Sequence, residues 1–209
     1  TEQYNTTDNT DCNDNNNLIH PAANETCNGR DDNCNNIIDE GGVCGCGCES
    51  ITNSSVVFVC GNKVTESCKM TCDLNCSGDG FIAGADNITI DGANYNLTGH
   101  GSGEGIKIEA GGHNNLIIEN FNSISHFSNG IITGMGTGGV LTNSIIRNNN
   151  VHSNDNVGIA IYDHSDNNQI INNNCHDNGR SGIDLYPSNN CVVNDNLCYN
   201  NGQSGINVL

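Results

Sequence analysis

The residues best suited to chemistry form a run of acidic and amide side chains near the N-terminus. Asp31, Asn33 and Asn35 alternate along the chain, and Asp39 and Glu40 follow them. Alternating oxygen ligands of this kind, completed by a backbone carbonyl, form the calcium-binding loop of EF-hand proteins. The spacing therefore predicts a site for a hard cation, and Ca²⁺ is the cofactor that we expect.

Three further residues, Asp11, Asn13 and Asp14, are placed to add ligands from the other side of such a loop. Asn36 stands where a calcium loop normally has glycine, and this departure predicts weaker affinity. Copper is disfavoured, because the region has no methionine cluster and only His20 as an imidazole ligand. The alternative is an acidic loop that is held by disulfides and binds no ion.

The same segment resembles a known metal-binding repeat. It reads Asp11-Cys-Asn-Asp, then Pro21-Ala-Ala-Asn-Glu-Thr-Cys27, then Gly29-Arg-Asp-Asp-Asn-Cys34 and, after four intervening residues, Asp39-Glu40. This pattern is similar to that of the surface-protein family named for copper-binding MopE. The resemblance covers residues 11–40 and implies that this module binds a metal ion.

Cysteine usage indicates an oxidising compartment. Ten of the 13 Cys lie between Cys12 and Cys76, where apolar residues are scarce. Disulfides there would replace a hydrophobic core, as in small secreted domains. We therefore expect an extracellular or cell-surface protein, with Thr1 as the first residue of a mature chain. The disulfide candidates are Cys12, Cys27, Cys34, Cys44, Cys46, Cys48, Cys60, Cys68, Cys72, Cys76, Cys191 and Cys198. The close-set Cys44, Cys46 and Cys48 have a second interpretation, a site for a soft metal.

Composition excludes two classes of partner. Six Lys and Arg against 24 Asp and Glu give a net charge of −18, which repels nucleic acid and anionic membranes. No stretch is apolar enough to cross a bilayer. The number of sequons for N-glycosylation is about what chance would give. All of them precede residue 100, however, which favours N-glycosylation of the first half of the chain. They lie at Asn5, Asn24, Asn53, Asn75, Asn87 and Asn96.

The second half of the chain repeats. A phrase of Gly followed by alternating apolar residues recurs at intervals of 23 to 28 residues, and a second short apolar phrase that ends in Asn lies between its copies. Short strands of period two, broken by Gly and Asn, predict one coil of a parallel β-helix per repeat. The density of Gly and Asn excludes α-helices. The first phrase begins at Gly105, Gly130, Gly158, Gly182 and Gly205.

These phrases resemble the repeats of NosD-like right-handed β-helix surface proteins. The chain is thus predicted to be all-β, with a right-handed parallel β-helix over residues 51–209. An acidic, Cys-rich module at 1–43 precedes it, followed by a Cys-rich linker at 44–50. Leu209 directly follows a strand phrase, so we expect either a fragment or an end that contacts another subunit.

Equivalent positions in successive coils should stack. Asn150, Asn174 and Asn196 are expected to form a column in which side-chain amides hydrogen-bond from coil to coil. His152 and His176 are also one coil apart, as stacked outward side chains or as a transition-metal site, with Cys198 expected next in their column. Cys175 takes an apolar core position, and Cys191 is expected to pair with Cys198.

No convincing catalytic set is present. The basic residues Lys107, Arg147 and Arg180 fall in separate coils, and the Gly99-His-Gly and Tyr162-Asp-His motifs are interpreted as turns. We therefore expect a non-enzymatic structural protein that associates head-to-tail with itself or with other surface components. The alternative is a carbohydrate-binding or carbohydrate-processing β-helix, which would need a cluster of outward aromatic side chains. The candidates are Phe121, Phe127, Tyr162, Tyr186 and Tyr199.

Overall fold

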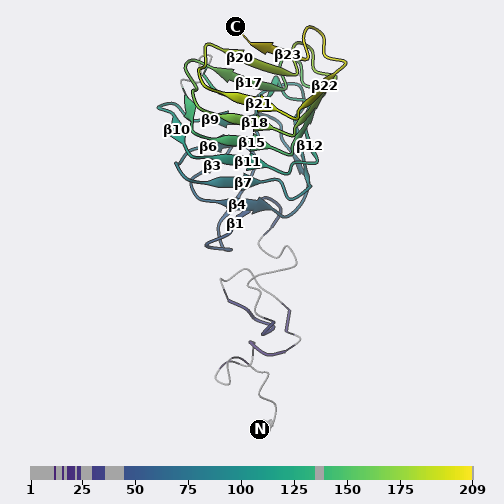
Figure 1. The fold of residues 1–209 in the computed structure, drawn as a ribbon. Helices are drawn as coiled ribbons and strands as arrows, with labels where there is room; N and C mark the ends of the chain where they lie inside the picture. The colour runs from purple at the N-terminus through teal and green to yellow at the C-terminus, as the bar shows by residue number, and fades with distance from the viewer. Residues whose placement is uncertain are drawn as a thin grey trace, which may run out of the picture.

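The computed structural model describes residues 12, 16, 18–21, 23–24, 30–35, 45–134 and 139–208. Within these ranges every regular element is a short strand, and the strands wind into a solenoid (Figure 1). The prediction of an all-β parallel β-helix is confirmed. Three sheets run along the solenoid, and each coil contributes one strand to each of them.

Sheet A has eight strands, sheet B seven and sheet C six. Sheet A runs in the order β2 (Val57–Phe58), β1 (Cys48–Ser50), β4 (Cys68–Met70), β7 (Thr89–Asp91), β11 (Ile117–Glu119), β15 (Ile145–Arg147), β18 (Gln169–Ile171) and β21 (Val192–Asn194). Sheet B contains β3 (Lys63–Val64), β6 (Phe81–Ala83), β9 (Glu104–Ile108), β13 (Asn129–Ile132), β17 (Ile159–Tyr162), β20 (Ile183–Tyr186) and β23 (Ile206–Val208). Sheet C contains β5 (Leu74–Asn75), β8 (Asn96–Thr98), β12 (Ser123–Ser125), β16 (Asn150–His152), β19 (Asn174–His176) and β22 (Leu197–Tyr199). A minor pair joins β10 (His113–Asn114) to β14 (Leu141–Thr142).

The core consists of apolar columns that run along the solenoid axis. Strands of successive coils pair in parallel and in register, so the inward residue of one coil stacks on the inward residue of the next. In sheet A this column contains Ile90, Ile118, Ile146 and Ile170, all fully buried. One β-branched or aliphatic side chain per strand is enough to fill so narrow an interior, which explains a modest apolar content of 34%.

The recurring Gly is required by a close approach between coils. A Cβ built on Gly158 would lie 2.5 Å from the backbone oxygen of Gly182 and 2.9 Å from Nδ2 of Asn178. A Cβ on Gly182 would likewise lie 2.6 Å from the backbone oxygen of Gly205. Because real Cβ atoms do not approach other atoms so closely, the sequence phrase that begins with Gly marks the point where each coil turns against the next.

Buried asparagine ladders connect the coils. Oδ1 of Asn173 accepts hydrogen bonds from the backbone N–H and from Nδ2 of Asn149, both at 3.1 Å. Oδ1 of Asn196 accepts the same two bonds from Asn173, at 2.9 and 3.0 Å. A second ladder of the same form contains Asn154, Asn178 and Asn201.

The predicted column of Asn150, Asn174 and Asn196 is therefore wrong by one residue at its end. Asn174 does donate a hydrogen bond to Asn150 at 3.0 Å, but both side chains lie outside the core and the next residue in their column is Leu197. Asn196 belongs to the buried ladder instead. The strand phrases contain adjacent Asn residues, and neighbouring residues of a strand point to opposite faces.

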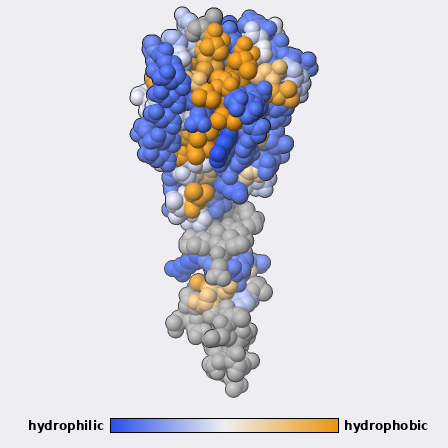
Figure 2. All heavy atoms as spheres, in the orientation of Figure 1, coloured by the Kyte–Doolittle hydropathy of each residue, from blue (hydrophilic) through white to orange (hydrophobic). Residues whose placement is uncertain are grey.

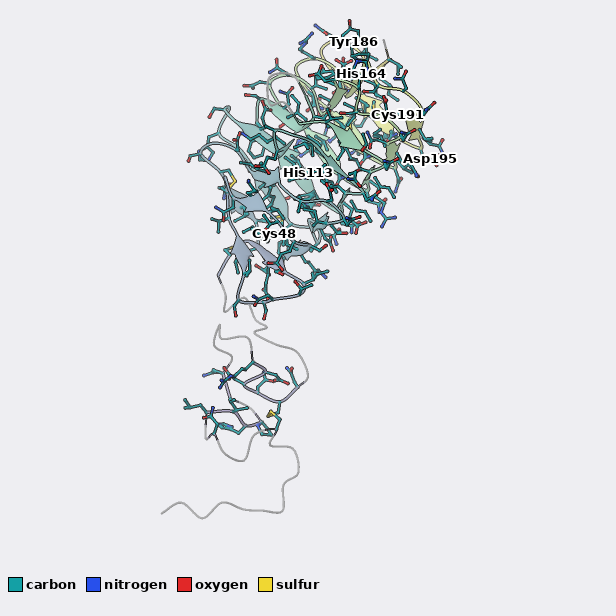
Figure 3. The ribbon with its side chains drawn as sticks, turned by 90° about the vertical axis from the view of Figure 1, so that its left-hand side faces the viewer. Cys48, His113, His164, Tyr186, Cys191 and Asp195 are labelled. Atoms are coloured by element: carbon teal, nitrogen blue, oxygen red, sulfur yellow. A yellow bond between two sulfur atoms is a disulfide. The ribbon has the colours of Figure 1, made fainter. Side chains whose placement is uncertain are left out.

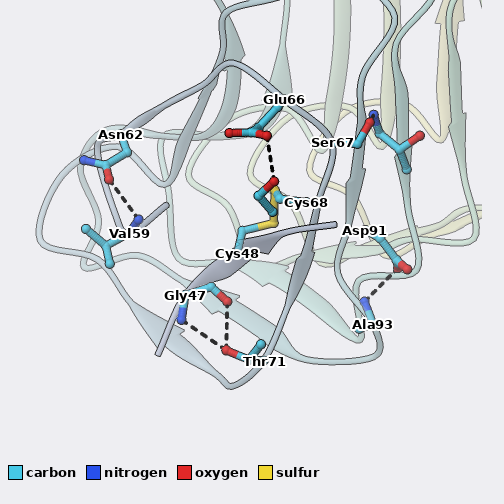
Figure 4. The surroundings of a disulfide bond; sticks show 12 residues. Gly47, Cys48, Val59, Asn62, Glu66, Ser67, Cys68, Thr71, Asp91 and Ala93 are labelled. Atoms are coloured by element: carbon cyan, nitrogen blue, oxygen red, sulfur yellow. Dashed lines mark hydrogen bonds between the residues drawn. A yellow bond between two sulfur atoms is a disulfide. The ribbon is translucent and has the colours of Figure 1, made fainter. Parts of the chain in front are cut away.

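The N-terminal end of the solenoid is closed by an antiparallel hairpin. Strand β1 pairs antiparallel with both β2 and β4, although Cys48–Ser50 lies in the segment that the sequence predicted as a linker. Three disulfides fix this end: Cys46–Cys72, Cys48–Cys68 and Cys60–Cys76. Figure 4 shows the surroundings of Cys48–Cys68, which joins β1 to β4. The carboxylate of Glu66 accepts hydrogen bonds from the hydroxyls of Thr52 and Ser50, and these bonds lower the pKa of Glu66.

The opposite end of the described solenoid is open. Strands β21, β22 and β23 are the edge strands of their sheets. Ile206 and Val208 continue the inward columns of Ile183 and Leu185, yet 45% and 64% of their surfaces are exposed. Figure 2 also shows apolar side chains gathered on the face where Figure 1 draws the strands of sheet A. At Ile206 and Val208, the last described coil thus presents core positions to solvent.

Candidate functional site

The predicted metal-binding loop is described only in its first part, residues 30–35. Within it, the backbone N–H of Asn35 donates hydrogen bonds to Oδ1 of Asp31 and to Oδ1 of Asn33, both at 3.1 Å. Two of the expected oxygen ligands therefore turn toward the same point of the backbone. These bonds close a local turn over residues 31–35, of the kind that Asp and Asn side chains form with nearby backbone N–H groups.

A disulfide and a backbone hydrogen bond stabilise this part of the chain. Cys12 and Cys34 are bonded to each other, which brings the first and last thirds of the motif together. The backbone N–H of His20 donates to the carbonyl of Asp32 at 2.9 Å, and Asp32 itself is buried. The remaining predicted ligands lie outside the described residues, and so do Cys27 and Cys44. These undescribed ligands are Asp11, Asn13, Asp14, Asp39 and Glu40.

Among the described residues, the structure pairs eight of the predicted disulfide cysteines and leaves three thiols free. The pairs are Cys12–Cys34 and the three of the N-terminal hairpin. The predicted bond between Cys191 and Cys198 is wrong, because both are free and they lie on different sides of the coil. Cys198 stacks in register on Cys175 in sheet C, whereas Cys191 precedes β21 in sheet A and donates to the carbonyl of Ser165.

Four of the predicted glycosylation sites, Asn24, Asn53, Asn75 and Asn87, are exposed. Asn96 is half-buried, and its Nδ2 donates to Asp73 at 3.0 Å while its Oδ1 accepts from Asn122 at 2.7 Å. Asn5 lies outside the described residues. Glycosylation stays a prediction, and accessibility favours it least at Asn96.

Aromatic rings stack on the outer face of sheet C. The ring centroids of His152 and His176 are 4.8 Å apart, and Tyr199 continues the stack at the same spacing. The residue that follows His176 in this column is therefore Tyr199 and not Cys198, as the sequence had predicted. Burial, and then the neighbouring His176, lower the pKa of His152.

The imidazole nitrogens of this stack are used by local hydrogen bonds. His152 contacts the hydroxyls of Ser123 and Ser153, at 3.0 and 3.1 Å. Nδ1 of His176 contacts the carboxylate of Asp177 at 2.7 Å. Its Nε2 contacts Oδ1 of Asn150 at 3.1 Å. In the described part of the chain, no group of three or more His, Cys, Asp and Glu is arranged to hold a metal ion. The stack therefore has the geometry of a structural feature.

The residues that could have indicated catalysis are dispersed. Lys107 forms an ion pair with Asp79, and Arg147 forms one with Glu119 at 2.6 Å, in different coils. His100 is an exposed turn residue. Each basic side chain of these two pairs is neutralised by a neighbouring carboxylate, so neither is placed as a free base for proton abstraction.

The Tyr162-Asp-His motif forms a corner of the coil. Asp163 and His164 have left-handed backbone conformations, with φ of 56° and 61°. The hydroxyl of Tyr162 donates to buried Asp184 at 2.8 Å. Burial, and then this hydrogen bond, raise the pKa of Tyr162 well above its ordinary value. His164 and Tyr186 lie near the last coils, far from His113 (Figure 3).

The five candidate aromatic side chains, all in the described part of the chain, do not form a platform for sugar rings. Phe121, Phe127 and Tyr162 are buried. Tyr186 and Tyr199 are exposed to 54% and 40%, but they lie on sheet B and sheet C respectively. A glycan-binding surface needs neighbouring aromatic faces that point outward. The distribution of these residues therefore favours a structural role over carbohydrate recognition.

Comparison with known protein families agrees with both parts of the chain. Residues 11–40 and 62–80 match the copper-binding MopE family, described as "Putative metal-binding motif". The second match covers β3 to β5 and their disulfide-bonded turns, and sequence inspection had missed it. No curated protein and no solved structure gives a significant match. No helix in the described ranges is long and apolar enough to cross a bilayer. Residues 74–209 match the family described as "Right handed beta helix region", so the chain belongs to the right-handed β-helix family.

Proposed function

We propose that this chain is a non-enzymatic structural protein of the extracellular surface, stabilised by calcium and disulfides, that assembles head-to-tail. The difference between the two ends of the solenoid carries this proposal. One end is closed by the β1–β2 hairpin and three disulfides, whereas the other exposes Ile206 and Val208, which occupy core positions. Open solenoid ends bury such surface against another layer of strands.

The direction of the edge strands suits a second copy of the chain as the partner. Strand β1 is antiparallel to both β2 and β4, so β2 runs in the same direction as β4. All later strands of sheet A are parallel to β4. The edge of β21 in one copy and the edge of β2 in the next can therefore continue sheet A with parallel pairing. Such a contact joins unlike surfaces and generates filaments when it does not close.

Electron microscopy of the protein at micromolar concentration in calcium tests this assembly. We expect filaments whose width is that of one solenoid. Replacing Ile206 with Asp should abolish them, because a carboxylate would be buried without a partner in the contact. Val192→Asp is the matched control, since Val192 is similarly exposed on the same coil but points outward from sheet A.

The outcomes separate three possibilities. Filaments lost with Ile206→Asp and retained with Val192→Asp support axial assembly. Discrete monomers of the unaltered protein at every concentration contradict it. Loss with Val192→Asp alone would replace axial assembly with lateral contact through the apolar face of sheet A.

Calcium binding supplies the second part of the proposal. It rests on the converging oxygens of Asp31 and Asn33 and on the acidic residues that follow them in the sequence. An ion that binds the folded state raises the free energy of unfolding. Titration calorimetry with CaCl₂ should detect binding, and Asp31→Asn should weaken it by roughly tenfold, because ligand charge sets affinity in such loops.

The control for this measurement removes the same charge elsewhere. Asp155 is exposed on the solenoid and distant in sequence from the motif. Asp155→Asn should leave the calcium affinity unchanged. Equal affinities for the two variants, or the absence of any heat with the unaltered protein, would contradict a calcium site at Asp31.

Extracellular placement rests on cysteine chemistry. The structure pairs eight cysteines in the described residues, and stable structural disulfides are typical of oxidising compartments. Exposed sequons at Asn24, Asn53, Asn75 and Asn87 are compatible with the same compartment.

A further inference from the structure

Two of the three free cysteines contact each other inside the solenoid. Cys175 in β19 and Cys198 in β22 are register partners in neighbouring parallel strands of sheet C. Their side chains lie close enough for each thiol to shift the pKa of the other. Neighbouring strands lie about 4.7–4.9 Å apart, and a disulfide accommodates Cα separations of roughly 4.4–6.8 Å. The backbone therefore already holds the two residues at a bonding distance.

We propose that Cys175 and Cys198 form a second class of disulfide in this protein, a cross-coil bond that ties the open last coil to the coil before it. The other described disulfides all lie at or before Cys76, in the acidic module and the N-terminal hairpin. The same oxidant that makes those bonds would act on Cys175 and Cys198. A disulfide donor, either oxidised glutathione or a protein disulfide, supplies the oxidising equivalents.

The reaction balances as a thiol–disulfide exchange. The thiolate of Cys198 attacks one sulfur of the donor, whose sulfur–sulfur bond breaks and releases one thiolate. Cys175 then loses its proton and attacks Sγ of Cys198, which expels the second thiolate of the donor. The two protons lost by the cysteines are taken up by the two released thiolates. The protein is oxidised by two electrons, and the donor is reduced to two thiols.

Accessibility determines which cysteine reacts first. Cys175 is fully buried, whereas Cys198 is only partly buried because no further coil covers it in the described structure. The interaction with Cys175 also lowers the pKa of Cys198, while the same interaction, and then burial, raise the pKa of Cys175. Cys198 is therefore the attacking thiol, and Cys175 resolves the mixed disulfide.

Peptide mapping with oxidised glutathione tests the proposal. The intact protein is incubated with the oxidant, quenched in acid, denatured, alkylated without reduction and digested. We expect a peptide that contains Cys175 joined to Cys198, and the loss of alkylation at both residues. Cys191 should still be alkylated after the oxidation step, because its thiol has no cysteine partner among the described residues. Full alkylation of both Cys175 and Cys198 after oxidation would overturn the proposal.

Single substitutions test the order of the two steps. Cys175→Ser should stop the reaction at a glutathione adduct on Cys198, since the resolving thiol is gone. Cys198→Ser should leave the buried Cys175 without an adduct and fully alkylated after denaturation. Cys191→Ser should form the cross-coil bond as the unaltered protein does. An adduct on Cys175 in the Cys198→Ser variant, which alters only the exposed coil, would refute the assigned order even if Cys175→Ser failed to fold.

Discussion

Replacing Asn173 with Ala is expected to lower the free energy of unfolding by roughly 3 kcal/mol or more. Asn173 is buried and takes part in hydrogen bonds on both sides. Its Oδ1 accepts two bonds from Asn149, and its Nδ2 donates to the carbonyl of Ile146 at 2.9 Å and to Asn196. The substitution leaves several buried polar groups unpaired, and each costs about 1–3 kcal/mol. Urea unfolding monitored by far-UV circular dichroism measures the effect.

The neighbouring Asn172 provides the matched control. Its side chain is exposed and donates a single bond to Asn148 at 2.8 Å, and its backbone is left-handed with φ of 55°. Asn172→Gly removes the amide without straining that conformation, so we expect a loss below about 1 kcal/mol. If both substitutions had the same cost, the buried ladder would contribute nothing beyond ordinary turn formation.

Replacing Gly158 with Ala is expected to be the second most damaging change, with a cost of about 1–3 kcal/mol from overpacking. The new Cβ would meet the backbone oxygen of Gly182 and Nδ2 of Asn178. Neither atom can move away easily, because the first belongs to the next coil and the second to a buried ladder. A lower midpoint of thermal unfolding would report this cost.

Gly78 is the control for this substitution. A Cβ on Gly78 meets nothing within 4 Å, and its backbone is not left-handed. Gly78→Ala should therefore be neutral or should stabilise the fold by roughly 0.4–1 kcal/mol, because alanine restricts the unfolded chain. A similar melting temperature for Gly158→Ala and Gly78→Ala would show that the coils can separate without penalty at the glycine column.

The sequence predicted the architecture because repetition is visible without knowledge of side-chain contacts. Each recurrence of Gly and Ile marks one coil, and the structure places Gly158 and Gly182 at the same point of successive coils. The phase within a coil was harder to predict. Asn148, Asn149 and Asn150 are adjacent and identical, yet they belong to different columns. Only the register of the strands shows which of them is buried.

The N-terminal hairpin could not be predicted for a different reason. Strands β1 and β2 contain three and two residues, too few for any periodicity, and the disulfide of β1 joins Cys48 to the distant Cys68 in β4, a pairing that the sequence alone does not specify. The metal motif shows the opposite case. Its fixed spacing predicted a set of ligands without any knowledge of the fold, and the described part shows only a local turn in which Asp31 and Asn33 accept hydrogen bonds from the backbone of Asn35.

The axial direction of the coil-to-coil bonds has a mechanical consequence. Parallel strands and asparagine ladders both connect one coil to the next, so a force along the axis acts on the hydrogen bonds between coils. In the described solenoid, the last coil is bonded to a neighbour on one side only, so it would separate first. The disulfide-bonded hairpin prevents the same peeling from the other end. Under tension, the described coils are thus expected to separate in one direction, from the last coil toward the N-terminal hairpin, where the disulfides stop the process.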